Sequence, residues 1–239
     1  MGESSLGSAV EWFRNQYADV SKLVDASCRK VNRSPSEVRI VAVTKYVDES
    51  VIPVLWQAGM TDFGENRWQQ AKPKLATLLP GEPTWHFIGR LQQNKVAVVV
   101  RHFDWIHSVD SPELLLSIDR SCAKEERTVQ CLLQVNVSGE ETKQGLSLDE
   151  VRALAKRAMD LHHLNVRGLM TMAPMARDME DVRPIFRGLR DLLHEVAREL
   201  GQADFNQLSM GMSGDFPVAV EEGATMIRVG RRLVVREGD

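Results

Sequence analysis

The stretch Arg39–Lys45, "RIVAVTK", determines the prediction of the fold. Its apolar, β-branched run predicts a buried strand. Lys45 stands where the apolar run stops, which puts a primary amine at the carboxyl end of that strand. A buried strand that ends in a polar side chain is typical of parallel α/β sheets, where such side chains gather at one edge.

The same unit, an apolar run followed by a helical pattern, repeats along the chain. The expected strands are 38–43, 61–63, 84–88, 105–109, 129–137, 166–170, 205–210 and 226–229. The expected helices between them are 49–58, 68–79, 94–102, 112–126, 148–161, 182–200 and 216–223. This alternation implies parallel pairing through right-handed crossovers, and eight units fit a (β/α)8 TIM barrel. A doubly wound open sheet is the alternative that the pattern leaves open.

An extra helix is expected before the first strand. Its apolar face recurs at steps of three and four residues, at Val10, Phe13, Tyr17, Val20 and Val24. We expect residues 1–35 to form this N-terminal helical extension. Because no linker or low-complexity tract interrupts the sequence, we expect one domain over residues 1–239.

Composition excludes several classes of partner. The net charge of −3 gives no general attraction to nucleic acid or to an anionic membrane. No apolar run approaches the length of a membrane span. The three cysteines have no metal-type or redox-type spacing, which indicates reduced thiols in a cytoplasmic protein.

Unusual polar residues follow each expected strand. They are Lys45, "FGEN" (63–66), "WHFIGRLQQNK" (85–95), "HSVD" (107–110), Asn136, "GLMTMAPMA" (168–176), "LSMGMSGDF" (208–216) and "RVGRR" (228–232). In a barrel these positions share one face, where barrel enzymes place their chemistry. The other interpretation is that these are ordinary polar loops.

The segment 209–216, "SMGMSGDF", has the composition of a phosphate-binding loop. Gly211 and Gly214 allow a sharp turn and a close approach of the backbone to a ligand. Ser209 and Ser213 supply hydroxyl groups, and the N-terminus of the next expected helix points back at the loop. A simple turn is the alternative.

Arg228 interrupts the last apolar run. Side chains alternate along a strand, so Arg228 faces away from Ile227 and Val229 and is expected inside the barrel. A guanidinium group there needs acceptors, either from a ligand or from a structural ion pair. Arg231 and Arg232 are expected at the rim, near an anion.

Lys45 then suggests a specific chemistry. Desolvation at an apolar barrel mouth and a nearby cation favour the neutral amine, which attacks aldehydes and forms a Schiff base. Beside a phosphate-type loop, the natural ligand is a phosphorylated aldehyde, and pyridoxal 5′-phosphate (PLP) is the leading candidate. A plain surface lysine that follows a strand is the alternative.

These motifs resemble those of the pyridoxal phosphate homeostasis proteins. The matching motifs, in order from the Lys45 strand to about Gly230, are "FGEN" with Gln69, "WHFIGRLQQNK", "HSVD", "VNVSGEETKQG", "RGLMTMAP", "LSMGMSGD" and "MIRVG". The resemblance implies a single barrel like the N-terminal half of alanine racemase. It also implies that Lys45 is the Schiff-base lysine.

The resemblance extends to a set of site residues. It implies a phosphate site from Ser209, Ser213 and the backbone near Gly230, and contact between Arg228 and the pyridine nitrogen. The expected cofactor-binding residues are Lys45, Asn66, His86, Ser209, Met210, Gly211, Ser213, Arg228, Gly230 and Arg231. After Gly230 the family usually has a small hydroxyl residue, but this chain has Arg231, so either an arginine contact replaces the hydroxyl or the C-terminal segment differs from the family's.

Two features favour holding the cofactor over using it. Arg228, as a cation and donor, leaves the pyridine nitrogen unprotonated and weakens the electron sink. Racemisation needs a second base, which a tyrosine of a further β-domain in the partner subunit supplies in alanine racemase-like enzymes. This sequence stops soon after its eighth expected strand, so no such domain is expected. Its two tyrosines are Tyr17 in the first helix and Tyr46, which is expected to point away from Lys45.

We therefore expect a monomeric, cytoplasmic protein that holds PLP as a Schiff base. It would buffer this vitamin B6 aldehyde or deliver it to PLP-dependent apoenzymes, without robust catalysis of its own. Two alternatives remain open: a PLP-dependent amino-acid racemase of low activity, and a Schiff-base aldolase that acts on a sugar phosphate without a cofactor.

Overall fold

The computed structural model describes residues 3–137, 139 and 144–235. Its strands are β1 Arg39–Val43, β2 Asp62–Glu65, β3 Thr84–Phe87, β4 Trp105–Val109, β5 Val129–Gln134, β6 Leu164–Met170, β7 Gln207–Met212 and β8 Met226–Val229. They form a closed barrel in sequence order, and β1 pairs in parallel with β8, with Ile40 opposite Ile227. This closure confirms the (β/α)8 prediction and excludes the open sheet.

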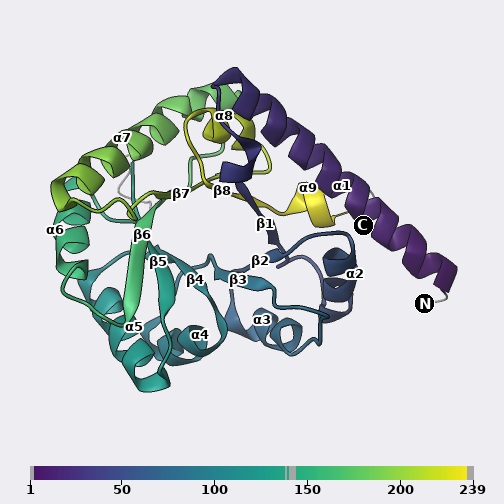
Figure 1. The fold of residues 1–239 in the computed structure, drawn as a ribbon, viewed down its shortest axis with the longest axis horizontal. Coiled ribbons are helices and arrows are strands. Elements are labelled where there is room, and N and C mark those ends of the chain that lie inside the picture. Colours follow the sequence, from purple (N-terminus) through teal and green to yellow (C-terminus); the bar gives the residue numbers. More distant parts are fainter. Residues whose placement is uncertain (1–2, 138, 140–143, 236–239) are drawn as a thin grey trace.

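Helices surround the barrel on the outside (Figure 1). They are α1 Glu3–Lys30, α2 Ile52–Gln57, α3 Trp68–Leu75, α4 Val96–His102, α5 Pro112–Glu125, α6 Leu148–Ala158, α7 Arg183–Leu200, α8 Phe216–Glu221 and α9 Arg231–Val234. The predicted N-terminal helix is present as α1, which packs along α2, α8 and α9. It ends at Lys30, before residue 35, and residues 1–2 of the predicted extension lie outside the described residues.

Strand alternation separates two apolar layers. Ile227 and Val229 of β8 belong to the large core between the strands and the helices. On the inner side of the strands, a small cluster comprises Trp105, Leu132, Met170 and Met226. Since Arg228 lies between Ile227 and Val229 in sequence, its side chain shares the inner side with Met226, and only 5 % of the residue is exposed.

Strand β7 continues two residues beyond the predicted end, to Met212, so Gly211 lies inside a strand. Gly211 has φ +91°, and a Cβ there would come within 2.6 Å of the Ala219 side chain in α8. The glycine is therefore required for close packing of β7 against α8.

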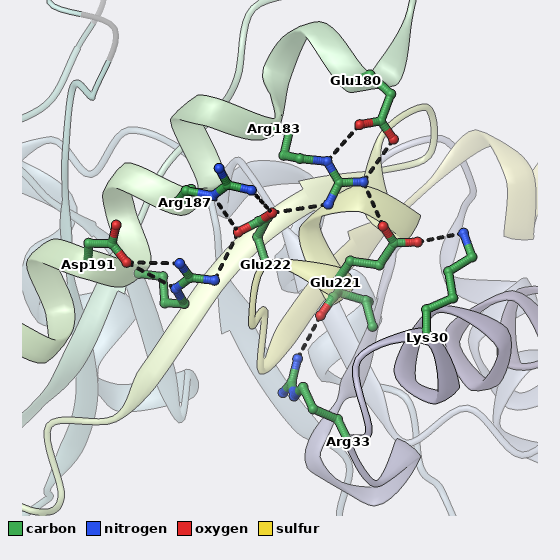
Figure 2. Close-up of polar contacts among 10 residues, drawn as sticks. Lys30, Arg33, Glu180, Arg183, Arg187, Asp191, Glu221 and Glu222 are labelled. Atoms are coloured by element: carbon green, nitrogen blue, oxygen red, sulfur yellow. Dashed lines mark hydrogen bonds and ion pairs between the residues drawn. The ribbon is translucent and has the colours of Figure 1, made fainter.

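A network of charged side chains joins α1, α7 and α8 (Figure 2). Glu222, the residue after α8, accepts hydrogen bonds from Arg183, Arg187 and Arg190 of α7. Glu221 pairs with Arg183 at 2.6 Å and with Lys30 at the end of α1 at 2.7 Å. These contacts attach the N-terminal helix to the barrel.

Within the described part of the chain, no helix combines the length and the apolar composition that crossing a membrane requires.

Candidate functional site

A cavity of about 520 Å³ lies at the carboxyl ends of the strands. Six of the ten predicted site residues line it: Lys45, Asn66, Ser213, Arg228, Gly230 and Arg231. Its wall also includes Tyr46 and three methionines of the loop after β6: Met172, Met175 and Met179. The barrel thus brings together residues from its first strand turn and from beyond its last strand, such as Lys45 and Arg231.

Lys45 lies two residues after the end of β1, in a turn that also contains Tyr46. Its Nζ lies 5.0 Å from the centroid of the Tyr46 ring. The expectation that Tyr46 points away from Lys45 is wrong, because the strand has ended and strand alternation no longer applies. The expected desolvation of the amine is also wrong for this structure, since Lys45 is exposed.

A buried ion pair fixes the backbone just before Lys45. The Lys74 ammonium donates to the carbonyl oxygen of Thr44 at 2.7 Å and to Glu65 at 2.5 Å. The Thr44 hydroxyl donates to the same Glu65 oxygen at 2.6 Å. Both charged side chains are almost fully buried. Sequence reasoning missed Lys74, although an acidic residue in "FGEN" and a lysine nine residues later in a helix are a usable signal.

Arg228 projects into the barrel beneath the cavity and contributes to its lining. Its guanidinium donates to the Thr171 carbonyl at 2.9 Å and to the Ser209 hydroxyl. Burial lowers the pKa of Arg228 to about 10, so the group stays charged at neutral pH. Two protein acceptors therefore fix the direction of a permanent cation at the floor of the cavity.

A chain of hydrogen bonds continues from Arg228 through the barrel interior. His107 Nδ1 lies 2.8 Å from Ser209 Oγ, and His107 Nε2 lies 3.0 Å from His86 Nδ1. His86 Nε2 then lies 3.0 Å from Asp62 Oδ1, at the start of β2. We call Arg228, Ser209, His107, His86 and Asp62 the barrel hydrogen-bond chain.

The geometry of this chain fixes its protons. Asp62 can only accept, so His86 Nε2 carries a proton; because burial lowers the pKa of His86 and favours the neutral ring, His86 Nδ1 accepts from His107 Nε2. His107 Nδ1 then accepts from the Ser209 hydroxyl, which accepts in turn from Arg228. Each imidazole carries one proton and is neutral. Burial lowers the pKa of His86, and it lowers that of His107 well below its usual value, in agreement with this assignment.

Four predicted residues are not among those that line the cavity. His86 and Ser209 lie in the barrel hydrogen-bond chain below it, and Gly211 packs against α8. Met210 belongs to the outer core, because alternation along β7 turns it away from Ser209. Sequence reasoning placed Ser209 and Met210 in one pocket, although adjacent residues of a strand face opposite sides. It missed Asp62, and it included His107 and Thr171 only within the motifs 107–110 and 168–176, without a role.

The loops after β7 and β8 approach each other at the cavity. The Gly230 N–H donates to the Ser213 hydroxyl at 3.3 Å. A Cβ at Gly230 would come within 2.9 Å of the Tyr46 ring, so only glycine fits there without a shift. Arg231 lines the cavity, whereas the Arg232 guanidinium lies 6.0 Å from the Phe216 ring centroid. The two rim arginines therefore point to different surroundings.

The donors of this cavity fit a phosphorylated aldehyde. They comprise an amine, a guanidinium, a hydroxyl and a backbone N–H, from Lys45, Arg228, Ser213 and Gly230. Asn66, which also lines the cavity, has a buried Oδ1 without a hydrogen-bond partner among the described residues. Such an atom is expected where a ligand supplies the missing donor. In the same part of the chain, no cluster of His, Cys, Asp and Glu side chains is arranged to hold a metal ion.

Comparison with known sequences finds one family model and several relatives that carry the same name. Residues 24–235 match the model of the alanine racemase N-terminal domain. The pyridoxal phosphate homeostasis protein of Aquifex aeolicus is 39% identical over 214 residues, which cover 90% of this chain and 93% of the relative. The Escherichia coli protein of the same name is 34% identical over 228 residues, with 90% and 93% covered.

Solved structures agree with the sequence relatives. The structure of PipY from Synechococcus elongatus with PLP bound has a TM-score of 0.78 and 36% identity, and the match covers 88% of this chain and 99% of PipY. Diaminopimelate decarboxylase from M. jannaschii shares the fold, with a TM-score of 0.72 at 15% identity, 94% of this chain and 60% of that chain being covered. The chain belongs to the pyridoxal phosphate homeostasis protein family, whose barrel is that of the alanine racemase N-terminal domain.

Proposed function

We propose that this chain binds PLP covalently through Lys45 and buffers or delivers it inside the cell. The observation that carries the proposal is that Lys45 and Arg228 line one cavity at the carboxyl end of the barrel. Membership of the homeostasis family and the presence of PLP in the related PipY structure support it.

Six residues that line the cavity have a proposed role toward the cofactor. Lys45 Nζ bonds to the aldehyde carbon, and one water leaves. Ser213, the Gly230 N–H and Arg231 bind the phosphate, since a hydroxyl, an amide and a guanidinium are phosphate donors. Arg228 donates to the pyridine nitrogen, and Asn66 Oδ1 accepts from the ligand. PLP itself, when bound, supplies an electron sink and a reactive aldehyde.

Holding the cofactor is better supported than using it. Arg228 is a fixed cation, held by Ser209 and Thr171, so it cannot take the part of an acid that protonates the pyridine nitrogen. Without that proton the electron sink is weak. We propose a carrier that releases PLP to apoenzymes, acting as a cytoplasmic monomer of one domain over residues 1–239.

An absorbance spectrum of the purified protein, taken after loading with PLP and removal of free PLP by gel filtration, tests the proposal. We expect a yellow species in the wild type that borohydride converts to a stable adduct. Lys45→Ala should lose it completely, whereas Lys72→Ala, which removes an exposed lysine of α3, should keep it. Colourless wild-type protein after gel filtration, or an equal yellow species in Lys45→Ala, would contradict the proposal. Colourless protein that borohydride links to a sugar phosphate would instead support the cofactor-free aldolase.

A slow amino-acid racemase is the second candidate, and one observation favours it. Tyr46 lies in the cavity beside Lys45, so a second titratable side chain is present at the site. A racemase predicts exchange of the α-proton of amino acids with deuterated solvent by the PLP-loaded protein. Loss of exchange in both Lys45→Ala and Tyr46→Phe would establish this activity, and no exchange over hours would exclude it.

A further inference from the structure

We infer that a second, cationic cavity beside the first binds an oxyanion of a small molecule, a phosphate or a carboxylate. This cavity has a volume of about 370 Å³ and lies between the loops that follow β2 and β3. It shares Asn66, Gly89 and Arg90 with the first cavity, so the two adjoin. The inference stands on this geometry, whether or not Lys45 binds PLP.

The charged side chains that line the second cavity are all cations. Arg67, Arg90 and Lys95 line the cavity, and no aspartate or glutamate does. The whole chain carries 33 acidic against 30 basic residues, so an all-cationic lining is not a consequence of composition. Beside the cations stand the side-chain amides of Gln69 and Gln92, which donate hydrogen bonds to oxyanions.

These cations have no partner in the part of the protein that the structure describes. The side chains of Arg67, Arg90 and Lys95 form no hydrogen bond or ion pair with any described residue. Arg90 acts electrostatically on Asp110, which lies outside the lining, but the two groups form no ion pair. Three cations that converge on one cavity repel one another, and an anion between them relieves that repulsion.

Lys95 is the most informative of the three. It ends the short 3₁₀ helix Gln93–Lys95 and is partly buried, unlike the exposed Arg67 and Arg90. An oxyanion in the cavity would give the Lys95 ammonium the partner that no described residue supplies. The planar donors of Arg67 and Arg90 suit a phosphate or carboxylate, which both present paired oxygens.

The ligand also has room for an apolar part. Trp68 and Phe87 line the same cavity, and the Trp68 ring packs at 4.9 Å, centroid to centroid, on His102 of α4, which fixes its orientation. A small organic anion, with its oxyanion on the cations and its carbon frame against Trp68, fits this arrangement. Its position next to the Lys45 cavity allows the two sites to be filled side by side.

Nuclear magnetic resonance of the indole N–H groups tests the inference. Trp68 lines the second cavity but not the first, so its resonance, assigned with Trp68→Phe, reports the second site alone. We expect inorganic phosphate to shift it saturably. Acetate is titrated separately. An equal shift of the Trp68 resonance shows a site for oxyanions in general, and a weaker shift shows a preference for phosphate. Both results support the inference.

Variants make the test specific. Lys95→Met and Arg67→Met should each weaken the response about tenfold or more, the effect of losing one charge-assisted contact. Ser213→Ala, in the first cavity, and Lys72→Met, on the exposed side of α3, should leave it unchanged. Arg67 is exposed, so its variant is expected to fold even if Lys95→Met does not. No saturable shift with either anion, or a full response in folded Arg67→Met, would overturn the inference. PLP loading at Lys45 is measured separately by absorbance, so failure of the proposed function can be told apart from failure of this inference.

Discussion

The charged network outside the barrel and the cations at its mouth use the same residue types in opposite ways. In the outer network, the single side chain of Arg183 contacts three glutamates, Glu180, Glu221 and Glu222. Lys30 also contacts Glu221 (Figure 2). At the mouth, the side chains of Lys45, Arg90 and Arg231 form no hydrogen bond or ion pair with a described residue.

The difference separates structural charges from functional ones. A cation that already has its carboxylates stabilises packing and has little left to offer a ligand. Lys74, buried against Glu65, belongs to the first kind although it lies close to Lys45. Lys45, whose ammonium lies 5.0 Å from the centroid of the Tyr46 ring, belongs to the second. Position near the site therefore does not decide the role of a lysine, but its partners do.

The largest effect on stability is expected at the buried pair. Lys74→Ala leaves Glu65 charged and buried without its partner, which should lower the free energy of unfolding by about 3–5 kcal/mol. Urea denaturation measures it. The double variant Lys74→Met, Glu65→Gln removes both charges and should recover most of the loss. If Lys74→Ala lowers the free energy of unfolding by less than about 1 kcal/mol, Lys74 is not a structural charge in this sense.

The outer network should contribute less per group. Glu222→Gln keeps the shape but removes a charge that three arginines share, and we expect a loss of about 2 kcal/mol, since those arginines are partly exposed. The matched control is Glu180→Gln, an exposed partner of Arg183, whose effect should be clearly smaller because solvent screens the pair. Equal losses of unfolding free energy in Glu222→Gln and Glu180→Gln would show that burial of the carboxylate does not set the size of its contribution.

The barrel hydrogen-bond chain should make stability fall in mild acid. His107 and His86 stay neutral in the folded barrel because burial lowers their pKa, while the unfolded chain takes up protons below about pH 6.5. The unfolded state then binds more protons, so the free energy of unfolding decreases from pH 7 to pH 5, by up to about 1.4 kcal/mol per pH unit for each histidine.

Other groups titrate mainly outside this window. Burial would raise the pKa of Glu222, but hydrogen bonds from Arg187 and Arg183 hold it below its usual value, so its stabilisation is lost only at lower pH. The pKa of Asp215 is raised by burial and acts in the opposite direction. Urea unfolding at several pH values measures the slope. His107→Asn should reduce it and exposed His194→Gln should not; an unchanged slope in His107→Asn would refute the neutral chain.

The smallest effect on stability is expected at the mouth. Lys45→Ala and Arg231→Ala each remove an exposed cation without a carboxylate partner, and both should change the free energy of unfolding by about 0.5 kcal/mol or less. Thermal unfolding of these variants without PLP measures the change, which is compared with the loss in Glu222→Gln. A loss of about 2 kcal/mol in either variant would show that a cation at the mouth also supports the fold.

Much of the barrel could be predicted from the sequence because its strands are short, apolar and separated by helical patterns. The loop motifs also located the cavity, since parallel strands carry their carboxyl ends to one face. Side-chain direction was predictable where a strand persists, as for Arg228. It was not predictable beyond the strand end, as Tyr46 shows, and neglect of alternation misplaced Met210. The barrel hydrogen-bond chain joins residues as far apart as Asp62 and Arg228, and no local pattern indicates such contacts.

The most direct test of the central claim is mass spectrometry of peptides after PLP and borohydride treatment of the intact protein. The unpartnered amine at the mouth should carry the cofactor, so we predict one modified peptide, the one that contains Lys45. Lys74 should remain unmodified, because its ammonium is buried and paired with Glu65. An unmodified Lys45 in the presence of excess PLP, or modification spread equally over several lysines, would contradict the account.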